Sequence, residues 1–254
     1  FPLLNKSLIK ENFDKILTVN SLNGLKRMST SGSTGTPLVV YQNKDKVRRN
    51  SADFIYFYNQ GGYSIGDKLY FLRAWENCKK NPIILFLTNM VMQETKNMSD
   101  KNIESFLNKL RLDKSKKSLW AYASSLTAIT NYIGNRDLSA EINIESIFSG
   151  SEVLPDQTKE KLMKTFQCPV YSRYSSQEMG LLAQQTKQQN DLFTLNNASY
   201  YFEFLKLNSN EPVKEGELGR IVVTDLFNKA MPLLRYDTGD IGSFKYSSDG
   251  KKYL

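Results

Sequence analysis

The chain has 254 residues, which is enough for one large domain or two smaller ones. It contains no histidine, so a Cys/His zinc site and any histidine-based triad or acid–base catalyst are excluded. Its net charge of +8 suits nucleic acid, a membrane surface or small polyanionic ligands. The lysines are scattered without a long basic tract, so we expect no specific nucleic-acid partner.

Cysteine content and hydropathy bear on the location of the protein. Cys78 and Cys168 lie far apart, and so low a cysteine content fits a reducing compartment, from which we expect a cytoplasmic protein. The first residues do not resemble a signal peptide, because Lys6 and Lys10 interrupt them. The longest apolar run, residues 82–92, falls short of the roughly 20 residues that a membrane span needs and indicates a buried strand or helix.

Apolar strands alternate with amphipathic helices between about residues 41 and 206. The expected strands are 38–41, 68–73, 118–122, 144–148 and 170–174, and the expected helices are 43–60, 99–110, 124–133 and 155–166. This alternation predicts a largely parallel sheet covered by helices. Beyond residue 191, strands at 200–207, 217–225 and 241–246 follow one another without a helix. We therefore expect an α/β nucleotide-binding core over residues 1–190 and a smaller antiparallel β subdomain over residues 191–254.

The segment of residues 30–37 has the composition of a phosphate cradle. It consists of Thr30, Ser31, Gly32, Ser33, Thr34, Gly35, Thr36 and Pro37. Glycines let a backbone approach a ligand closely, and successive N–H groups together with hydroxyls form a nest for an anion. An expected strand follows at once, which anchors the segment and favours phosphate binding. A solvated Ser/Thr/Gly linker is the alternative.

A second polar segment, residues 149–152, directly follows the expected strand 144–148. Its members are Ser149, Gly150, Ser151 and Glu152. Ligands of parallel α/β sheets collect at the carboxyl ends of the strands, so this position suits a binding role. An ordinary strand-to-helix turn, in which Asp156 helps the next helix to begin, is the alternative.

The third segment repeats this arrangement after the expected strand 170–174. Its members are Tyr174, Ser175, Ser176, Gln177 and Glu178. A glutamate at a strand end can hold a hard cation such as Mg²⁺, which prefers oxygen ligands. Alternatively, Glu178 begins the next helix near its positive end.

The fourth segment, residues 235–240, reads Arg-Tyr-Asp-Thr-Gly-Asp and ends at Asp240. A carboxylate on a rigid turn can accept hydrogen bonds from both hydroxyls of a ribose, as acidic residues do in dinucleotide-binding folds. A plain β-turn also uses Asp, Thr and Gly. The neighbouring Arg235 favours the functional interpretation.

Together, the four segments occur in the order and spacing of one family. The chain resembles the adenylate-forming (acyl-CoA synthetase-like, AMP-binding) superfamily, and within it the phenylacetate–CoA ligase branch, which includes relatives associated with capsular and cell-surface polysaccharide biosynthesis. The resemblance implies the α/β fold of the large N-terminal domain of such an enzyme, with a mostly parallel sheet flanked by helices and a small antiparallel β subdomain.

The resemblance also implies roles for the four segments. Residues 30–36 become the phosphate loop, with Thr34 as a catalytic residue, and residues 149–152 lie beside adenine. Tyr174 stacks on adenine, Glu178 is catalytic and binds Mg²⁺, and Asp240 holds the ribose hydroxyls. Ser175, Ser176 and Gln177 complete the set of nucleotide-binding residues.

The implied reaction has two steps. A small-molecule carboxylic acid attacks the α-phosphate of ATP to give an acyl-adenylate and pyrophosphate, and a thiol such as coenzyme A then displaces AMP. The implied cofactors are ATP or AMP, Mg²⁺ and coenzyme A as co-substrate. Backbone groups, hydroxyls and Mg²⁺ can stabilise charge on the phosphate without histidine.

The sequence departs from the family pattern at several positions. Thr36 and Leu38 flank Pro37 where the family loop carries a lysine, and Ser175 and Gln177 stand where the family has Gly and Thr or Ser. We expect the chain to begin later than family members do and to lack the small C-terminal lid domain with its catalytic lysine, so that it is poorly active alone. A non-catalytic scaffold of the same fold is the alternative, a basic nucleic-acid-binding protein is a weaker one, and a homodimer is left open.

Overall fold

The computed structural model describes residues 1–29, 37–75 and 81–254, and the chain divides into two compact units. Unit 1 comprises Phe1–Phe54, Ser175–Ala183 and Leu192–Leu254, and unit 2 comprises Ile55–Tyr174 and Gln184–Asp191. Residues 1–54 thus group with the C-terminal strands, whereas the sequence pattern had placed them with the α/β core.

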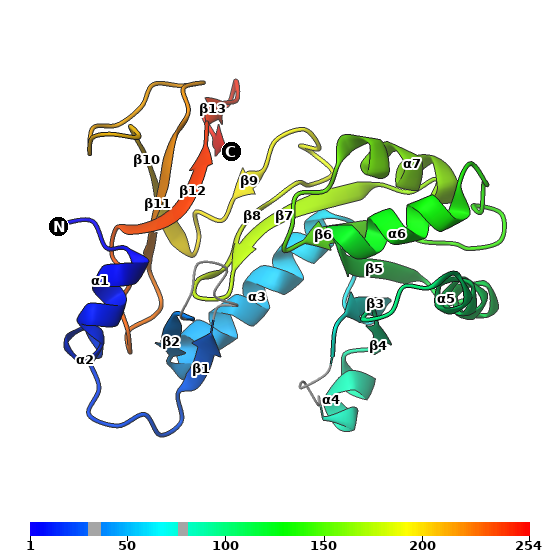
Figure 1. Cartoon of the computed structure of the whole chain (residues 1–254), viewed down its shortest axis with the longest axis horizontal. Helices are drawn as coiled ribbons and strands as arrows, with labels where there is room; N and C mark the ends of the chain where they lie inside the picture. The colour runs from blue at the N-terminus through cyan, green and yellow to red at the C-terminus, as the bar shows by residue number, and fades with distance from the viewer. Residues whose placement is uncertain (30–36, 76–80) are drawn as a thin grey trace. The chain divides into compact units, whose positions relative to one another are not determined.

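Unit 2 is built on a parallel sheet with the strand order β7-β6-β5-β3-β4 (Figure 1). Its strands are β3 (Lys68–Arg73), β4 (Met90–Glu94), β5 (Lys117–Tyr122), β6 (Ile147–Gly150) and β7 (Val170–Ser176, of which Ser175 and Ser176 belong to unit 1). Its helices are α4 (Pro82–Leu87), α5 (Asp100–Leu112), α6 (Ala123–Ile133) and α7 (Asp156–Phe166). The expected parallel α/β arrangement is confirmed. Strand β6 begins three residues later than expected, and β7 extends two residues further, to Ser176.

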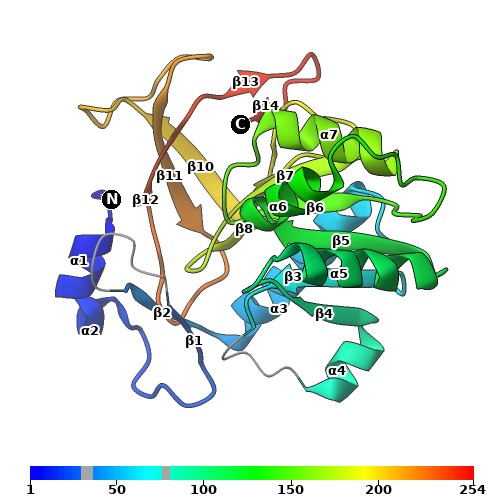
Figure 2. The ribbon, with the colours of Figure 1, turned by 45° about the vertical axis from the view of Figure 1, so that its right-hand side comes forward.

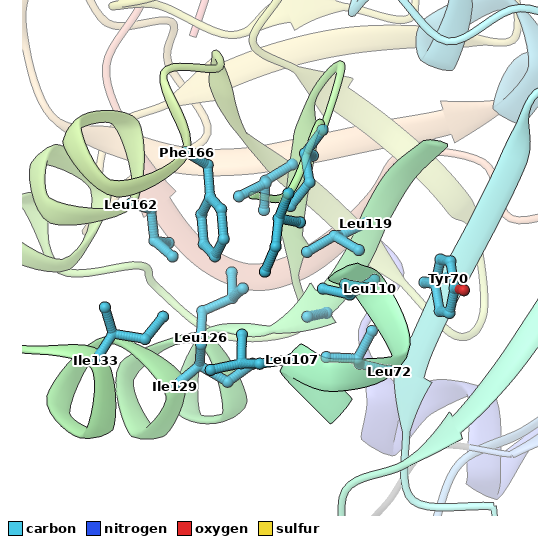
Figure 3. Close-up of a cluster of buried hydrophobic side chains, with 14 of the residues drawn as sticks. Tyr70, Leu72, Leu107, Leu110, Leu119, Leu126, Ile129, Ile133, Leu162 and Phe166 are labelled. Atoms are coloured by element: carbon cyan, nitrogen blue, oxygen red, sulfur yellow. The ribbon is translucent and has the colours of Figure 1, made fainter. Parts of the chain in front are cut away.

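One face of this sheet packs against α5, α6 and α7 (Figure 3). Helix α5 contributes Ile103, Phe106, Leu107 and Leu110, which recur at the three- and four-residue spacing that puts side chains on one helix face. Leu72 and Ile147 of the sheet are fully buried against these helices. The apolar core of unit 2 thereby fixes the strands whose ends carry the predicted site residues.

The opposite face of the sheet receives the end of α3 (Lys44–Gln60), the part of that helix that belongs to unit 2. The rings of Tyr58 and Phe148 meet edge-on with their centroids 4.8 Å apart. The Tyr58 hydroxyl accepts a hydrogen bond from Arg173 of β7 at 2.9 Å. Both faces of the central strands are therefore covered, as parallel sheets require.

Unit 1 contains antiparallel structure, which confirms the expected small antiparallel sheet. Strands β10 (Tyr200–Leu205), β11 (Gly219–Asp225) and β12 (Tyr236–Gly242) form a three-stranded antiparallel sheet, which Figure 2 shows with its strands side by side. The other elements of unit 1 are α1 (Lys6–Glu11), α2 (Phe13–Ile16), β1 (Lys26–Ser29), β2 (Val39–Gln42), the first part of α3, β8 (Gly180–Gln184, of which Gln184 belongs to unit 2), β9 (Thr194–Leu195), β13 (Lys245–Tyr246) and β14 (Lys252–Tyr253).

The apolar run of residues 82–92 corrects one expectation. It folds as helix α4 followed by strand β4, but α4 is not buried: Ile83 is 66% exposed and Phe86 is 84% exposed. The Asn81 side chain caps the helix and Pro82 begins it, so local signals set its boundary. Within the described parts of the chain, every helix is too short or too polar to cross a lipid bilayer.

Candidate functional site

The predicted phosphate loop connects two strands that pair with each other. Residues 30–36, which include the predicted catalytic residue Thr34, lie outside the described residues, whereas the strands on either side are described. Strands β1 and β2 are antiparallel, and Ser29 pairs with Val39. The sequence pattern predicted the strand after this segment but missed β1, which is short and carries no periodic signal.

The second predicted segment begins inside β6. Ser149 and Gly150 are the last residues of that strand, and both are buried. Ser149 is 1% exposed, and its hydroxyl oxygen has no hydrogen-bond partner among the described residues. A Cβ atom on Gly150 would lie 3.1 Å from the ring of Trp120, so the lack of a side chain lets the indole pack against this strand end. Ser151 follows in the left-handed backbone region, with φ of 69°.

Glu152 has a partner that the sequence did not predict. It is exposed, and its Oε2 accepts a hydrogen bond from the backbone N–H of Ser124 at 2.8 Å. Ser124 lies in the first turn of α6, where N–H groups lack partners within the helix and the helix dipole favours a negative charge. Glu152 therefore stabilises the start of α6 in this structure.

The third predicted segment forms a β-hairpin instead of the start of a helix. Tyr174, Ser175 and Ser176 are half-buried residues of β7, and residues 177–179 form the turn into β8. Gln177 is exposed at the tip, and the Ser176 hydroxyl accepts a hydrogen bond from the Met179 N–H at 3.1 Å. The alternative in which Glu178 begins a helix is wrong, because the chain turns back into a strand.

Three side chains from distant parts of the sequence hold the Glu178 turn. Glu178 is only 4% exposed, and its Oε1 accepts a hydrogen bond from the Tyr236 hydroxyl at 2.8 Å. The Gln42 side-chain amide donates to the Glu178 carbonyl oxygen at 3.1 Å. The Tyr200 hydroxyl donates to the carbonyl oxygen of Met179. Both the backbone and the carboxyl group of Glu178 are thus held in one arrangement.

A buried ion pair supports this turn from behind. The Lys46 ammonium group lies 2.7 Å from the Asp225 carboxylate, and both side chains are fully buried. Lys46 also donates to the Tyr200 hydroxyl at 2.8 Å. Burial lowers the pKa of Lys46, although Asp225 opposes this shift, and burial raises the pKa of Tyr200. Lys46 of α3 thus contacts both Asp225 of β11 and the Tyr200 hydroxyl, which in turn donates to Met179.

Close packing also shapes the turn at Gly180. Its φ is +104°, a region that residues with a Cβ atom rarely adopt. A Cβ atom there would lie 2.7 Å from Asn50 Oδ1. Gly180 therefore lets β8 begin directly against α3, which brings Met179 and Glu178 next to their partners.

Residues 236–240 of the fourth predicted segment belong to strand β12, which corrects the expectation of a rigid turn. Its register against β11 shifts between Arg220 and Val222, and residues 238–240 bulge opposite Ile221, with Gly239 at a φ of +82°. Asp240 is exposed on this bulge, and its N–H donates to the Thr238 hydroxyl at 3.1 Å.

The other aspartate of this segment has a structural role. The Asp237 carboxylate forms an ion pair with Arg220 at 2.7 Å and also accepts the Gly239 N–H at 3.1 Å. Asp237 thus helps to hold the bulge that presents Asp240. The two aspartates that are close in sequence consequently have different surroundings.

Sequence reasoning missed Gln42, Lys46 and Tyr200, and it gave Tyr236 no role of its own. The bond from Lys46 to Tyr200 spans 154 positions and that from Tyr236 to Glu178 spans 58, so no local spacing marks these pairs. The burial of Lys46 on α3 would indicate a buried partner, but the sequence alone does not show that this lysine is buried.

Glu178 fits a magnesium ion whose remaining ligands come from bound phosphates and waters. Among the described residues, no three His, Cys, Asp or Glu side chains gather as a metal cage. Mg²⁺ commonly binds one or two carboxylates together with substrate phosphates and waters, and Glu178 supplies one oriented carboxyl group. When bound, the ion would neutralise charge on the phosphates.

Solved structures define the class of protein whose fold this chain shares. The chain superposes on an open conformation of 2-hydroxyisobutyryl-CoA ligase, in complex with an acyl-AMP and CoA, with a TM-score of 0.77 over 99% of this chain and 61% of that one, at 15% identity. It also matches ATP-bound MatB from Rhodopseudomonas palustris with a TM-score of 0.64 over 89% of this chain and 46% of that one, at 13% identity. The chain has the fold of the N-terminal domain of adenylate-forming enzymes, as the four segments indicated.

A curated protein is similar to this chain in sequence. The chain is 27% identical over 245 residues to protein CapK of Staphylococcus aureus, which covers 94% of this chain. The chain spans about half (52%) of the length of that relative. No protein-family model matches the chain.

Proposed function

We propose that this chain is the nucleotide-binding part of an ATP-dependent acid–thiol ligase, which converts a carboxylic acid into an acyl-adenylate and transfers the acyl group to coenzyme A or another thiol. The observation that carries the proposal is the fold match over 99% of the chain to a ligase solved with its acyl-AMP and CoA. The similarity to CapK and the resemblance to polysaccharide-related relatives support a role in capsular or surface polysaccharide biosynthesis. With ATP and coenzyme A as co-substrates, the proposed location is the cytoplasm.

The proposal assigns a role to several of the predicted residues. Tyr174 stacks on the adenine ring, and the exposed Asp240 carboxylate accepts hydrogen bonds from the ribose hydroxyls. Glu178 holds Mg²⁺, and Tyr236 fixes the orientation of its carboxyl group. Hydrogen-bond donors of residues 30–36 hold the phosphates. These groups are neutral or anionic and none must give up or take a proton, which agrees with a chain that lacks histidine.

Two observations favour a second candidate function, that of a non-catalytic scaffold with the same fold. The exposed Gln177 stands where relatives of this kind carry Thr or Ser, and the Glu152 carboxylate is bound to the first turn of α6. A scaffold would keep the fold without activating an acid. ATP–pyrophosphate exchange separates this candidate from the ligase.

Binding of AMP to the chain tests the nucleotide assignments. A ligand that binds only the folded state stabilises it by about 2.7 kcal/mol at 100 times its Kd, so AMP should raise the melting temperature. We expect Asp240→Ala and Tyr174→Ala to weaken AMP binding at least about tenfold, which corresponds to about 1.4 kcal/mol. Tyr201→Ala is a matched control, because Tyr201 is 63% exposed on β10 and has no assigned role.

Two results would contradict these assignments. In the first, GMP raises the melting temperature as much as AMP does. In the second, both variants bind AMP as tightly as the Tyr201→Ala control. Equal stabilisation by GMP would remove the adenine specificity of the site, and the two results together would remove the roles of Tyr174 and Asp240.

A further inference from the structure

A chain of two hydrogen bonds connects helix α3 to the backbone of Glu178. The side-chain amide of Asn50 donates to Oε1 of Gln42 at 3.2 Å, and the side-chain amide of Gln42 donates to the carbonyl oxygen of Glu178 at 3.1 Å. Gln42 is buried, so little water competes for these bonds. Hydrogen bonds in a chain polarise one another, so the contact with Asn50 strengthens the bond that holds Glu178.

A second chain of hydrogen bonds reaches the next residue of the same turn. Lys46 donates to the Tyr200 hydroxyl at 2.8 Å, and this hydroxyl donates to the carbonyl oxygen of Met179. Both of these side chains are buried, and the Asp225 carboxylate holds the ammonium group at 2.7 Å. Because the first donor is a cation, the hydroxyl becomes a stronger donor toward Met179.

Both chains begin on one face of α3 and end on consecutive carbonyl groups. Lys46 and Asn50 are four residues apart, a spacing that makes side chains neighbours on a helix. The carbonyl groups of Glu178 and Met179 belong to consecutive rigid peptide planes, so holding both fixes the point from which the Glu178 side chain starts. The Tyr236 hydroxyl holds the other end of that side chain, at Oε1. All of these residues belong to unit 1.

We propose that Asn50 and Lys46 are positioning residues, which hold the Glu178 carboxylate where it binds a divalent cation. The identity of that cation rests on the proposed function. Mg²⁺ requires near-ideal octahedral geometry, and a carboxylate that is already held in place loses little conformational freedom when the ion binds. Neither positioning residue touches the ion, so both act through Gln42 and Tyr200.

Variants at uncharged members of the two chains test this role. Lys46→Gln would leave Asp225 buried without its cation, which destabilises the whole protein. Tyr200→Phe interrupts the same chain but keeps that ion pair. Asn50→Ala interrupts the other chain at its first donor.

Hydrogen exchange of the Met179 amide measures how firmly the turn is held, without any nucleotide. This N–H donates to a hydroxyl at the end of β7, so its exchange reports local opening of the turn. We expect Asn50→Ala and Tyr200→Phe each to speed the exchange about tenfold, which corresponds to the loss of one hydrogen bond. Ser51→Ala and Tyr201→Phe are matched controls, which change exposed neighbours and should leave it unchanged. Unchanged exchange in the first two variants, or equal acceleration at the amides of β11, overturns the positioning role.

ATP binding with and without Mg²⁺ tests whether the held carboxylate serves a cation. The ratio of the Kd for ATP in EDTA to the Kd for ATP in Mg²⁺ measures what the ion contributes. Asn50→Ala and Tyr200→Phe should lower this ratio about tenfold, a loss typical of residues that orient metal ligands, and leave AMP binding in EDTA unchanged. In a Glu178→Ala background, Asn50→Ala should lower the ratio no further, because it acts only through this carboxylate.

Three outcomes separate this proposal from the proposed function. If both variants keep the ratio of the unaltered chain, the positioning role is overturned and the nucleotide site stands. If Asn50→Ala lowers the ratio further in the Glu178→Ala background, the positioning role is overturned as well. If Mg²⁺ does not strengthen ATP binding by the unaltered chain while Met179 exchange still responds to the variants, the cation role of Glu178 is overturned and only the hold on its turn stands.

Discussion

Glu152 and Glu178 occupy similar places in the sequence and very different places in the structure. Each follows a strand of the sheet and a run of small hydroxyl residues. Glu152 is exposed and has one bond, to the first turn of the neighbouring helix α6. Glu178 is buried, and Gln42, Tyr200 and Tyr236 hold its turn from three other elements.

The Glu152 carboxylate stabilises the start of a nearby helix, whereas contacts with residues distant in sequence orient the Glu178 carboxylate. The bond of Glu152 joins residues 28 positions apart and satisfies a helix end. Orienting Glu178 requires a buried tyrosine of β12, and a buried ion pair stands behind the hydroxyl that holds Met179. Buried polar networks of this kind are costly unless they are fully satisfied, so they persist where a defined geometry is needed. Glu178 is accordingly the stronger candidate for a role in the reaction.

The largest effect is expected where the buried carboxyl group loses its donor. Tyr236→Phe removes the hydroxyl and leaves Glu178 buried without that hydrogen bond, which should lower the free energy of unfolding by about 1–3 kcal/mol. Urea unfolding measures the loss. Tyr201→Phe is the matched control, because Tyr201 is exposed on β10 of the same three-stranded sheet. Equal stability of the two variants would show that the Tyr236 contact does not fix Glu178.

A smaller effect is expected at the exposed glutamate. Glu152→Ala removes one acceptor from the first turn of α6 and should cost about 0.5–2 kcal/mol, as the loss of a helix cap does. Glu160→Ala, at an exposed position on α7, controls for the loss of a surface charge. The comparison also predicts that Glu152→Ala leaves AMP binding in Mg²⁺ unchanged, whereas Glu178→Ala weakens it. Equal losses of AMP binding would erase the distinction between the two residues.

The sequence was sufficient for the elements that local patterns determine. The periodic apolar residues of α5 and α7 predicted both helices to within two residues, and β3 was predicted at its observed bounds. The parallel order of strands followed from the alternation of strands and helices. Strand β1 was missed because its four residues carry no alternation, and burial of α4 was predicted wrongly because an apolar run does not reveal whether a partner covers it.

The candidate site shows the same limit. Motif spacing selected Glu178 and Asp240, but it did not reveal that Tyr236, four residues before Asp240, donates to Glu178. That contact depends on how β12 and the hairpin of β7 and β8 pack, which short-range patterns do not encode. The bulge at residues 238–240 was likewise interpreted as a turn, because Asp, Thr and Gly favour both structures.

ATP–pyrophosphate exchange by the full-length protein, measured over a panel of carboxylic acids, separates the ligase from the scaffold. Formation of an acyl-adenylate is reversible, so an active enzyme incorporates labelled pyrophosphate into ATP only when its acid is present. We expect acid-dependent exchange with at least one member of the panel and loss of this exchange in Glu178→Ala. Folded protein that binds AMP but shows no exchange with any acid would contradict the ligase and favour the scaffold.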